Sequence, residues 1–386
     1  MNIPPKAFAA GQLIVGDNAF VDYCLKSQAH KTAFVISDNI AANQALTTQL
    51  FTEIYGNRDH KIIATVSTEP TKAQLESYMA SIRDYKPDTI IAVGGGSVID
   101  TAKTLWLFLE LPHLTWESAM KYYQVEKRPG NTILVAVPTT SGTGSEMTGA
   151  AMLTDENGVK KMILTNEVLT SIAILDFTFL KSLPPKVIVY SGVDALTHDL
   201  EAATDTISDP FTQFLCIQAI VTLFNDLPKS LKGDLEARNR VHIASMVAGF
   251  GINHGGCGLA HSINTPGEDY HLPHGLITGM LLPYTVDALV PSPIIANILT
   301  QLGRPVHEEK DQVVFKDLLW ELYDQLNMPK CLRDLGLDEM EYLVKLDKYC
   351  TRFETNDRAY SVAATVPSPE QIREIFTSLY YGPKGR

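Results

Sequence analysis

The segment Thr89-Ile-Ile-Ala-Val93-Gly-Gly-Gly-Ser97-Val-Ile-Asp100 is the stretch of sequence that is most informative about the fold. Its first five residues form a short apolar run without alternation, which predicts a buried strand. Three glycines then allow the backbone to approach a pyrophosphate closely, and the N–H groups of a following helix turn would face that anion. The segment therefore predicts a strand, a phosphate-binding loop and a helix. A tight strand-to-helix turn would carry the same residues, and the loop is not the standard GxGxxG fingerprint.

Further strands are predicted on both sides of this segment, at Thr32–Ser37, Lys61–Val66 and Thr132–Val137. Near-continuous apolar strands that alternate with helical segments indicate a parallel sheet covered on both faces. The first half of the chain is therefore predicted to be an α/β dinucleotide-binding domain.

The second half contains few β-rich runs and several amphipathic stretches that predict helices, at residues 194–203, 210–224, 236–250 and 313–326. The segment Leu183-Pro-Pro-Lys186 separates the halves, because two prolines stop a helix and stiffen the connection. We expect an α/β domain over residues 1–182 and an all-α domain over residues 183–386.

The composition is that of a packed globular protein, with 386 residues, 45% hydrophobic and 20% charged. The net charge of −12 argues against nucleic acid or an anionic membrane as a partner. The five cysteines show no CxxC pair, which is typical of a reducing compartment. No signal peptide and no apolar run of membrane-spanning length is evident, so we expect a cytoplasmic location without a membrane partner.

Four residues of the second half predict a metal site. Asp194 and His198 are separated by four positions, which places them on one face of a helix, about 5–6 Å apart at Cβ. His261 and His274 follow downstream. A His₃Asp set suits a borderline divalent ion such as Fe²⁺ or Zn²⁺ with one position open for substrate. Cys257, among glycines near His261, could be a further ligand, but a small buried residue is the more common role.

Two other features extend the predicted nucleotide site. The polar turn Pro138-Thr-Thr-Ser-Gly-Thr143-Gly-Ser-Glu146 follows a strand and would suit a phosphate, a ribose or the nicotinamide amide. Asp38 ends another strand, where a carboxylate would bind ribose hydroxyls and repel a 2′-phosphate, which favours NAD over NADP. The alternative role for Asp38 is the N-cap of a helix from Ile40 onward.

Taken together, these motifs resemble the iron-containing alcohol dehydrogenase family. The resemblance rests on motifs that occur in family order over roughly residues 10 to 290, namely Gly94–Asp100, Pro138–Glu146, Ser182–Pro185, Gly192–His198, Gly258–His261, Leu272–Gly275 and Met280–Pro283. It implies a dehydroquinate synthase-like architecture, NAD(P)-dependent interconversion of an alcohol and an aldehyde or ketone, and a homodimer or an assembly of dimers.

The resemblance also implies roles for individual residues. The metal ligands would be Asp194, His198, His261 and His274, and the name of the family favours Fe²⁺ over Zn²⁺. The cofactor contacts would be Asp38, Gly95, Gly96, Ser97, Thr139, Thr140, Thr143 and Lys161. The alternative role for Lys161 is a solvated charge in a hairpin, and nearly the same holds for its neighbour Lys160.

The chain departs from the family pattern around the predicted metal. Thr265 stands where many members carry a histidine, the spacing from His261 to His274 is shorter, and His271 and His254 are additional histidines. Histidine titrates in the range needed for proton transfer, so His271 and His254 are candidates for the proton relay. For His271, an alternate metal ligand or a solvent-facing loop residue are the other interpretations. Small residues at 149–151 replace bulkier ones that often shape the substrate pocket.

We therefore expect an NAD-dependent, metal-dependent alcohol dehydrogenase that acts as an aldehyde reductase on a small, polar substrate. A reductase of an anionic aldehyde, bearing a carboxylate, sulfonate or phosphonate, is an alternative, because residues 149–151 and His254 could make room for such a group. A dehydroquinate synthase-like lyase is less favoured, because residues 250–285 contain no Lys or Arg to hold a phosphate. A non-catalytic binding protein would require an incomplete ligand set.

Overall fold

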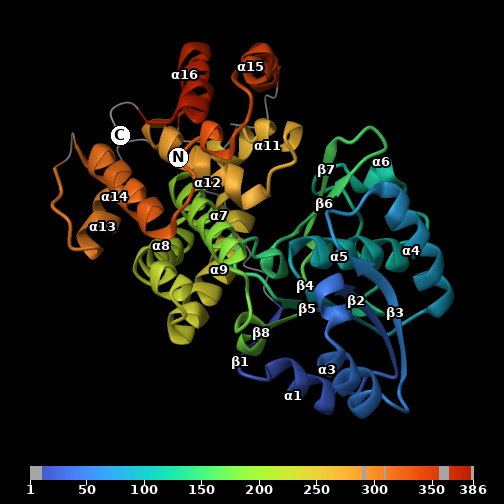
Figure 1. Ribbon diagram of the computed structural model, residues 1–386. Coiled ribbons are helices and arrows are strands. Elements are labelled where there is room, and N and C mark those ends of the chain that lie inside the picture. The colour runs from blue at the N-terminus through green and yellow to red at the C-terminus, as the bar shows by residue number, and fades with distance from the viewer. Residues whose placement is uncertain (1–10, 289–292, 308–309, 356–364, 384–386) are drawn as a thin grey trace. The chain divides into compact units, whose positions relative to one another are not determined.

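The computed structural model describes residues 11–288, 293–307, 310–355 and 365–383. It divides into two compact units that meet in sequence between Leu183 and Pro184. The described strands all belong to the first unit, and the three longest helices belong to the second, as the labels of Figure 1 indicate.

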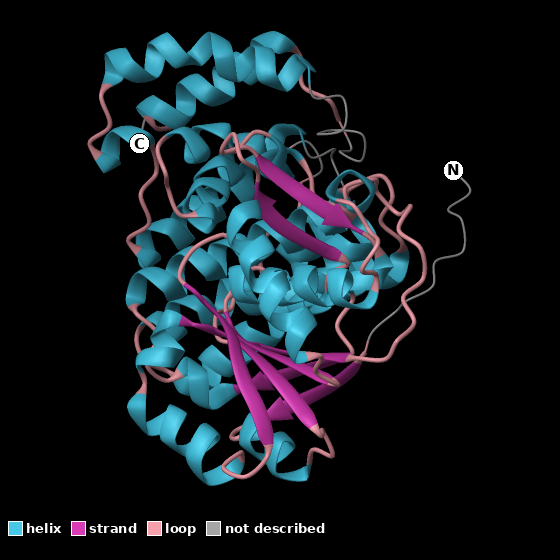
Figure 2. Cartoon of the chain, turned by 90° about the vertical axis from the view of Figure 1, so that its right-hand side faces the viewer, coloured by secondary structure: helices cyan, strands magenta, loops and turns pink. Residues whose placement is uncertain are grey.

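The first unit is built on a six-stranded sheet with the order β1-β8-β5-β4-β2-β3, in which every neighbouring pair is parallel. An antiparallel hairpin, β6–β7, forms a separate pair of strands (Figure 2). The strands are β1 (Gln12–Gly16), β2 (Lys31–Ser37), β3 (Asp59–Val66), β4 (Thr89–Gly94), β5 (Ile133–Pro138), β6 (Ala150–Thr154), β7 (Lys160–Leu164) and β8 (Ile172–Asp176). The helices are α1 (Ala19–Lys26), α2 (Asp38–Ala42), α3 (Gln44–Thr47), α4 (Lys72–Tyr85), α5 (Gly96–Glu110) and α6 (Trp116–Ala119).

The central strands are buried on both faces, because successive side chains of a strand point to opposite sides. Along β4, Ile90 and Ala92 belong to a core cluster that contains residues of α4 and α5. Ile91 and Val93 belong to a second cluster that contains residues of α1 and α2. This division explains the apolar runs without alternation, and it confirms the prediction of a parallel sheet covered on both faces.

The predicted strands at residues 32–37, 61–66, 89–93 and 132–137 correspond to β2, β3, β4 and β5. Strands β1 and β8 were not predicted from the sequence. Both are only five residues long, and β1 is an edge strand in which Leu13 and Val15 are exposed. Their pairing with the sheet depends on neighbours distant in sequence.

The second unit is helical throughout its described residues. Its three longest helices are α7 (Pro185–Thr204), α8 (Pro210–Leu231) and α9 (Leu235–Gly255). Each of them packs against the other two. Helix α7 begins with Pro185 at its first turn, where a proline costs no hydrogen bond, and Asp209 caps the helix that begins at Pro210. The helices are α7 (Pro185–Thr204), α8 (Pro210–Leu231), α9 (Leu235–Gly255), α10 (Leu259–Ser262), α11 (Thr265–Asp269), α12 (His274–Thr285), α13 (Pro293–Gln301), α14 (Asp311–Leu326), α15 (Glu339–Thr355) and α16 (Pro369–Tyr381).

The fold class predicted from sequence is confirmed, with an α/β part followed by a helical part. The four predicted amphipathic stretches fall within α7, α8, α9 and α14. Within the described ranges, none of the helices is both long enough and apolar enough to cross a membrane.

Candidate metal centre and cofactor site

Helix α7 brings two of the predicted metal ligands together. Asp194 and His198 lie one turn apart, and both are buried. The Nδ1 atom of His198 is 3.9 Å from Oδ2 of Asp194. Because α7 packs against both α8 and α9, these polar side chains are held inside the helical unit rather than on its surface.

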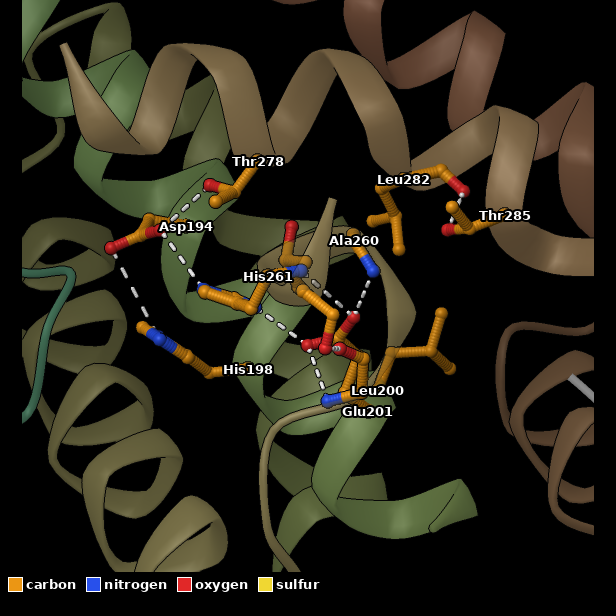
Figure 3. Close-up of polar contacts among 12 residues, drawn as sticks. Asp194, His198, Leu200, Glu201, Ala260, His261, Thr278, Leu282 and Thr285 are labelled. Atoms are coloured by element: carbon orange, nitrogen blue, oxygen red, sulfur yellow. Dashed lines mark hydrogen bonds and ion pairs between the residues drawn. The ribbon is translucent and has the colours of Figure 1, made fainter. Parts of the chain in front are cut away.

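The other two histidines come from short segments that pack beside α7. His261 lies in α10, and His274 is the first residue of α12. Their Nε2 atoms are 3.6 Å and 3.8 Å from Oδ1 of Asp194, respectively. One donor atom from each of Asp194, His198, His261 and His274 lies within 4.8 Å of the other three. Figure 3 shows Asp194 with His198 and His261 directed toward it.

This arrangement fits a divalent metal ion. Separations of 3.6 to 3.9 Å are too long for hydrogen bonds, whereas donors that each lie about 2.1 Å from one ion are roughly 3–4 Å apart. The Nε2 atom of His261 is buried and makes no hydrogen bond in the described part of the chain. A metal ion would give this nitrogen a partner.

The electrostatics of the cluster also favour a cation. Burial alone would raise the pKa of the Asp194 carboxyl, but His198, His274 and His261 together hold it well below its ordinary value. Burial would lower the pKa of His261, yet Glu201 and Asp194 raise it to about 10. The carboxylates of Glu201 and Asp194 therefore place negative charge beside His261. Thr278 in α12 donates a hydrogen bond of 2.8 Å to Oδ1 of Asp194 and helps to orient it.

Glu201 is a residue of this centre that the sequence analysis did not identify. It lies in α7, three residues after His198, and its carboxylate is 2.6 Å from Nδ1 of His261. Burial would raise the pKa of Glu201, but His261 and the N–H of Gly258 lower it. The available signal was its position on the same helix, since residues three apart are neighbours on a helix surface.

In the α/β unit, the glycine loop lies between β4 and α5 as predicted. Gly95 is the N-cap of α5, and a Cβ atom built on Gly94 would lie 2.4 Å from Val98. A Cβ on Gly96 would lie 2.9 Å from the side chain of Thr143. The loop therefore requires residues without side chains, and it presents the N-terminus of a 15-residue helix.

The second polar turn lies beside this loop. The N–H of Thr139 donates to the carbonyl of Gly94 at 3.0 Å, and Oγ1 of Thr140 is 3.3 Å from where a Cβ on Gly95 would stand. β4 and β5 are parallel neighbours, so both turns lie at the same edge of the sheet. Two of the motifs singled out from sequence thus form one surface at the start of α5.

Asp38 also lies at a carboxyl end of the sheet, directly after β2, which is the other neighbour of β4. It is exposed and is the first residue of α2. The helix N-cap is Ser37, whose hydroxyl accepts from the N–H of Ile40. The alternative role for Asp38 as the N-cap is therefore wrong.

Lys161 and Lys160 lie in the β6–β7 hairpin. Lys161 forms an ion pair of 3.5 Å with Asp155, and Lys160 forms one of 2.9 Å with Glu69. These contacts agree with charged residues of a hairpin, and a cofactor contact of Lys161 stays a prediction.

A buried charged network lies under the polar turn. Nζ of Lys103 in α5 is fully buried and donates to the carbonyls of Thr148 and Ala150 at 2.7 and 2.8 Å. Asp100 accepts a 2.6 Å hydrogen bond from the hydroxyl of Ser145. Burial lowers the pKa of Lys103 to about 8 and raises that of Glu146 to about 7. The network fastens residues 145–150 to the helix that follows the glycine loop.

The remaining candidate residues of the helical unit have different environments. His271 is exposed, adopts a positive φ of 51° and is not one of the four residues of the cluster. His254 is buried near the end of α9, with Nδ1 2.8 Å from the carbonyl oxygen of Phe250. Cys257 is exposed and lies outside the cluster, which corrects the expectation of a small buried residue.

Two of the small residues at 149–151 have defined contacts within the α/β unit. Ala151 is completely buried in the core cluster of the α/β unit with Leu153 and Ile163. The carbonyl of Ala150 accepts from Lys103. The size of these two residues agrees with the packing of the hairpin, and the expectation that residues 149–151 widen the substrate pocket stays a prediction.

Comparison with known proteins agrees with this combination of fold and site. The family model "Iron-containing alcohol dehydrogenase" matches residues 10–177, and the model "Fe-containing alcohol dehydrogenase family, C-terminal" matches residues 188–380. The chain belongs to the iron-containing alcohol dehydrogenase family, and it is an oxidoreductase that acts on a CH–OH group.

Individual relatives support the same conclusion. The chain is 32% identical over 334 residues to an NADPH-dependent butanol dehydrogenase of Clostridium saccharobutylicum, covering 83% of this chain and 84% of that protein. It is 32% identical over 329 residues to an alcohol dehydrogenase of Thermococcus barophilus, covering 84% and 85%. A solved iron-containing alcohol dehydrogenase of Thermococcus thioreducens superposes with a TM-score of 0.87 at 30% identity, covering 98% of this chain and all of the other.

Proposed function

We propose that this protein is a metal-dependent, NAD(H)-linked alcohol dehydrogenase that works as an aldehyde reductase on a small, polar substrate. The observation that carries the proposal is the convergence of four donor atoms within 4.8 Å in the helical unit. One divalent ion would be held by Asp194, His198, His261 and His274. The name of the family favours Fe²⁺, and the same nitrogen and oxygen donors also suit Zn²⁺.

The bound metal would supply a Lewis acid that makes an alcohol more acidic or polarises a carbonyl. Asp194 contributes the negative charge of the ligand set, and Thr278 orients its carboxylate. The three imidazoles leave the set with a modest net charge, which suits a site that must also accept an uncharged substrate. Burial of Asp194 and His198 limits the access of water to these two donors.

For the cofactor, we propose that the pyrophosphate binds at the start of α5, against Gly95, Gly96 and Ser97, with Thr139, Thr140 and Thr143 beside it. NAD would supply the hydride acceptor. Asp38 supports NAD over NADP, because an exposed carboxylate at the carboxyl end of β2 suits ribose hydroxyls and repels a 2′-phosphate. The similar Clostridium enzyme is named as NADPH-dependent, so the comparison of NADH with NADPH is an essential measurement.

The proton relay is proposed at His271 or His254. His271 is exposed and can exchange protons with solvent, whereas His254 is buried beside the carbonyl of Phe250. Replacement of each by Gln, with kcat followed against pH, distinguishes them. The relay residue is the one whose loss removes the corresponding pH dependence.

Assembly into homodimers and a cytoplasmic location belong to the same proposal. Strand β1 supports pairing between copies, since it is an edge strand with Leu13 and Val15 exposed at 42% and 45%. Edge strands present unpaired backbone groups to other chains. Sedimentation of the purified chain measures the assembly size.

The function is tested with purified protein, NADH and a panel of neutral and anionic aldehydes, before and after removal of metal. We expect His274→Ala to lower kcat/KM about 1,000-fold, because several kcal/mol of charge stabilisation are lost. His113→Ala, which removes an exposed histidine of the other unit, is the matched control and should retain activity. Undiminished turnover by verified metal-free protein contradicts the proposal. Turnover of anionic aldehydes alone excludes the neutral substrate class.

A further inference from the structure

Glu201 makes an unusual number of contacts for one buried side chain. Its carboxylate accepts hydrogen bonds from the N–H groups of Gly258 at 2.9 Å and Ala260 at 2.6 Å. It also lies 2.6 Å from Nδ1 of His261, and only 2% of the residue is exposed. Figure 3 shows the carboxylate of Glu201 on the side of the His261 ring opposite Asp194.

These contacts determine which nitrogen of His261 is available. An ionised carboxylate can only accept hydrogen bonds, so Nδ1 of His261 must carry the proton that joins it to Glu201. In the neutral ring, Nε2 then holds the free lone pair. Nε2 is the atom that faces Asp194 at 3.6 Å and makes no hydrogen bond among the described residues.

The same carboxylate also holds the backbone that carries His261. Helix α10 is only four residues long, which is too short to be stable by its own hydrogen bonds. Its first N–H groups would be unsatisfied without a capping group. Glu201 supplies the acceptor from α7, and it therefore fixes both the backbone and the ring of His261 relative to the two ligands on α7.

We infer that Glu201 is a positioning residue of the metal centre, which selects Nε2 of His261 as the ligand atom and anchors α10. The inference rests on the proposed metal site at Asp194, His198, His261 and His274. Carboxylates that accept from a ligating histidine change metal affinity by about 10–100-fold when they are replaced.

The test measures metal binding by the full-length chain, without reference to activity. Zn²⁺ affinity of Glu201→Gln is determined by competition with a chelator, and Co²⁺ alone serves as a spectroscopic probe of ligand geometry. We expect Zn²⁺ affinity to fall about 10–100-fold and the Co²⁺ absorption to shift, because an amide has one acceptor oxygen for contacts that now use two.

Asp199→Asn is the matched control. Asp199 lies on the same helix, is completely buried and faces Cys216 rather than a ligand, so its replacement should leave Zn²⁺ affinity within about twofold. Equal affinity and an unchanged Co²⁺ spectrum in Glu201→Gln overturn the inference. Failure of the wild-type chain to bind Zn²⁺ overturns instead the proposed metal site, so the two failures are distinguishable.

A measurement on the wild-type chain makes the inference testable even if Glu201→Gln does not fold. In the Zn²⁺-loaded protein labelled with ¹⁵N-histidine, the His261 ring should show a protonated Nδ1 and a metal-bound Nε2. The signal is assigned by its loss in His261→Gln. A metal-bound Nδ1 overturns the inference.

Discussion

At the scale of single residues, Glu146 is a buried carboxyl whose ionisation opposes folding. Burial raises its pKa from 4.5 to about 7, with the charge of Lys103 as a smaller opposing influence. Below pH 4.5 the group is protonated in both the folded and the unfolded chain. Between pH 4.5 and 7 the unfolded chain loses the proton while the folded chain keeps it, so folding stability decreases as the pH rises.

We therefore predict that Glu146→Gln removes a pH-dependent loss of stability. Between pH 4.5 and 7.5 the wild type should lose about 3 kcal/mol of unfolding free energy relative to the variant, since each pKa unit is worth about 1.4 kcal/mol. Urea unfolding at a series of pH values measures this difference. Glu146 lies in the α/β unit, whereas the proposed metal ligands lie in the helical unit. Any loss of stability from metal release at low pH should therefore be the same in the wild type and in the variant. Parallel pH profiles contradict the prediction.

Thr278 gives a second prediction at this scale. Its hydroxyl donates to Asp194 at 2.8 Å, so Thr278→Val should leave the carboxylate less well oriented and reduce Zn²⁺ affinity about 10-fold. Thr278→Ser keeps the hydroxyl and serves as the control. Chelator competition gives both affinities, and an unchanged Zn²⁺ affinity in Thr278→Val contradicts the prediction.

The identities of the predicted ligands were accessible from sequence, but the supporting residues were not. Asp194 and His198 are specified by helix periodicity, and His261 and His274 by the family motif. Glu201 is one of several acidic residues near the end of α7, together with Asp199 and Asp205. Which of them contacts His261 depends on how residues 256–260 pack against α7, and no local sequence pattern predicts that packing.

At the scale of elements, close packing of α12 against α7 sets the ligand geometry. A Cβ on Gly275 would lie 2.2 Å from the carbonyl oxygen of Tyr190 and 2.9 Å from Cβ of Asp194. One turn later, a Cβ on Gly279 would lie 2.5 Å from Val193. The two glycines therefore allow the helix that begins with His274 to approach the helix that carries Asp194 and His198.

Gly275→Ala should separate these helices. The carbonyl of Tyr190 is backbone and cannot turn aside, so we expect a loss of about 1–3 kcal/mol in unfolding free energy and at least a tenfold loss in Zn²⁺ affinity. Denaturant unfolding and chelator competition measure the two effects. Gly303→Ser is the control. Gly303 has a positive φ of 68°, and nothing lies within 4 Å of where its Cβ would stand. The substitution therefore introduces backbone strain without a clash, and metal affinity should persist.

Elements were predictable where burial leaves a strong pattern. Continuous apolar runs identified β2, β4 and β5, and amphipathic periodicity identified α7, α8 and α9. The short helices α10 and α11 carry no such pattern, because their stability comes from residues distant in sequence. The buried network of Lys103 and Glu146 was likewise hidden, since both residues read as ordinary charged positions of a helix and a turn.

At the scale of the whole molecule, the proposed metal and cofactor sites belong to different compact units. The four ligands lie between residues 194 and 274, and the glycine loop and polar turn lie between residues 94 and 146. A ligand stabilises the part of the chain that it binds, by about 2.7 kcal/mol at a concentration 100 times its dissociation constant.

Hydrogen exchange should therefore respond separately to the two ligands. We predict that Zn²⁺ added to the metal-free chain slows exchange in α7, α10 and α12, and that NAD⁺ slows it in residues 94–100 and 138–146, by up to about 100-fold in each case. Mass spectrometry of peptide fragments measures both patterns. Zn²⁺ protection confined to residues before 183 contradicts the proposed assignment.

The placement of two ligands on one helix has a consequence during protein synthesis. Once α7 has left the ribosome, the chain already carries the pair Asp194 and His198, whereas His261 follows His198 by 63 residues and His274 by 76. At about 5–20 residues per second, this interval lasts roughly 3 to 15 seconds. For that time the nascent chain offers an open two-ligand site to any metal ion in its surroundings. The proposed four-residue site is complete only after α10 and α12 have been synthesised.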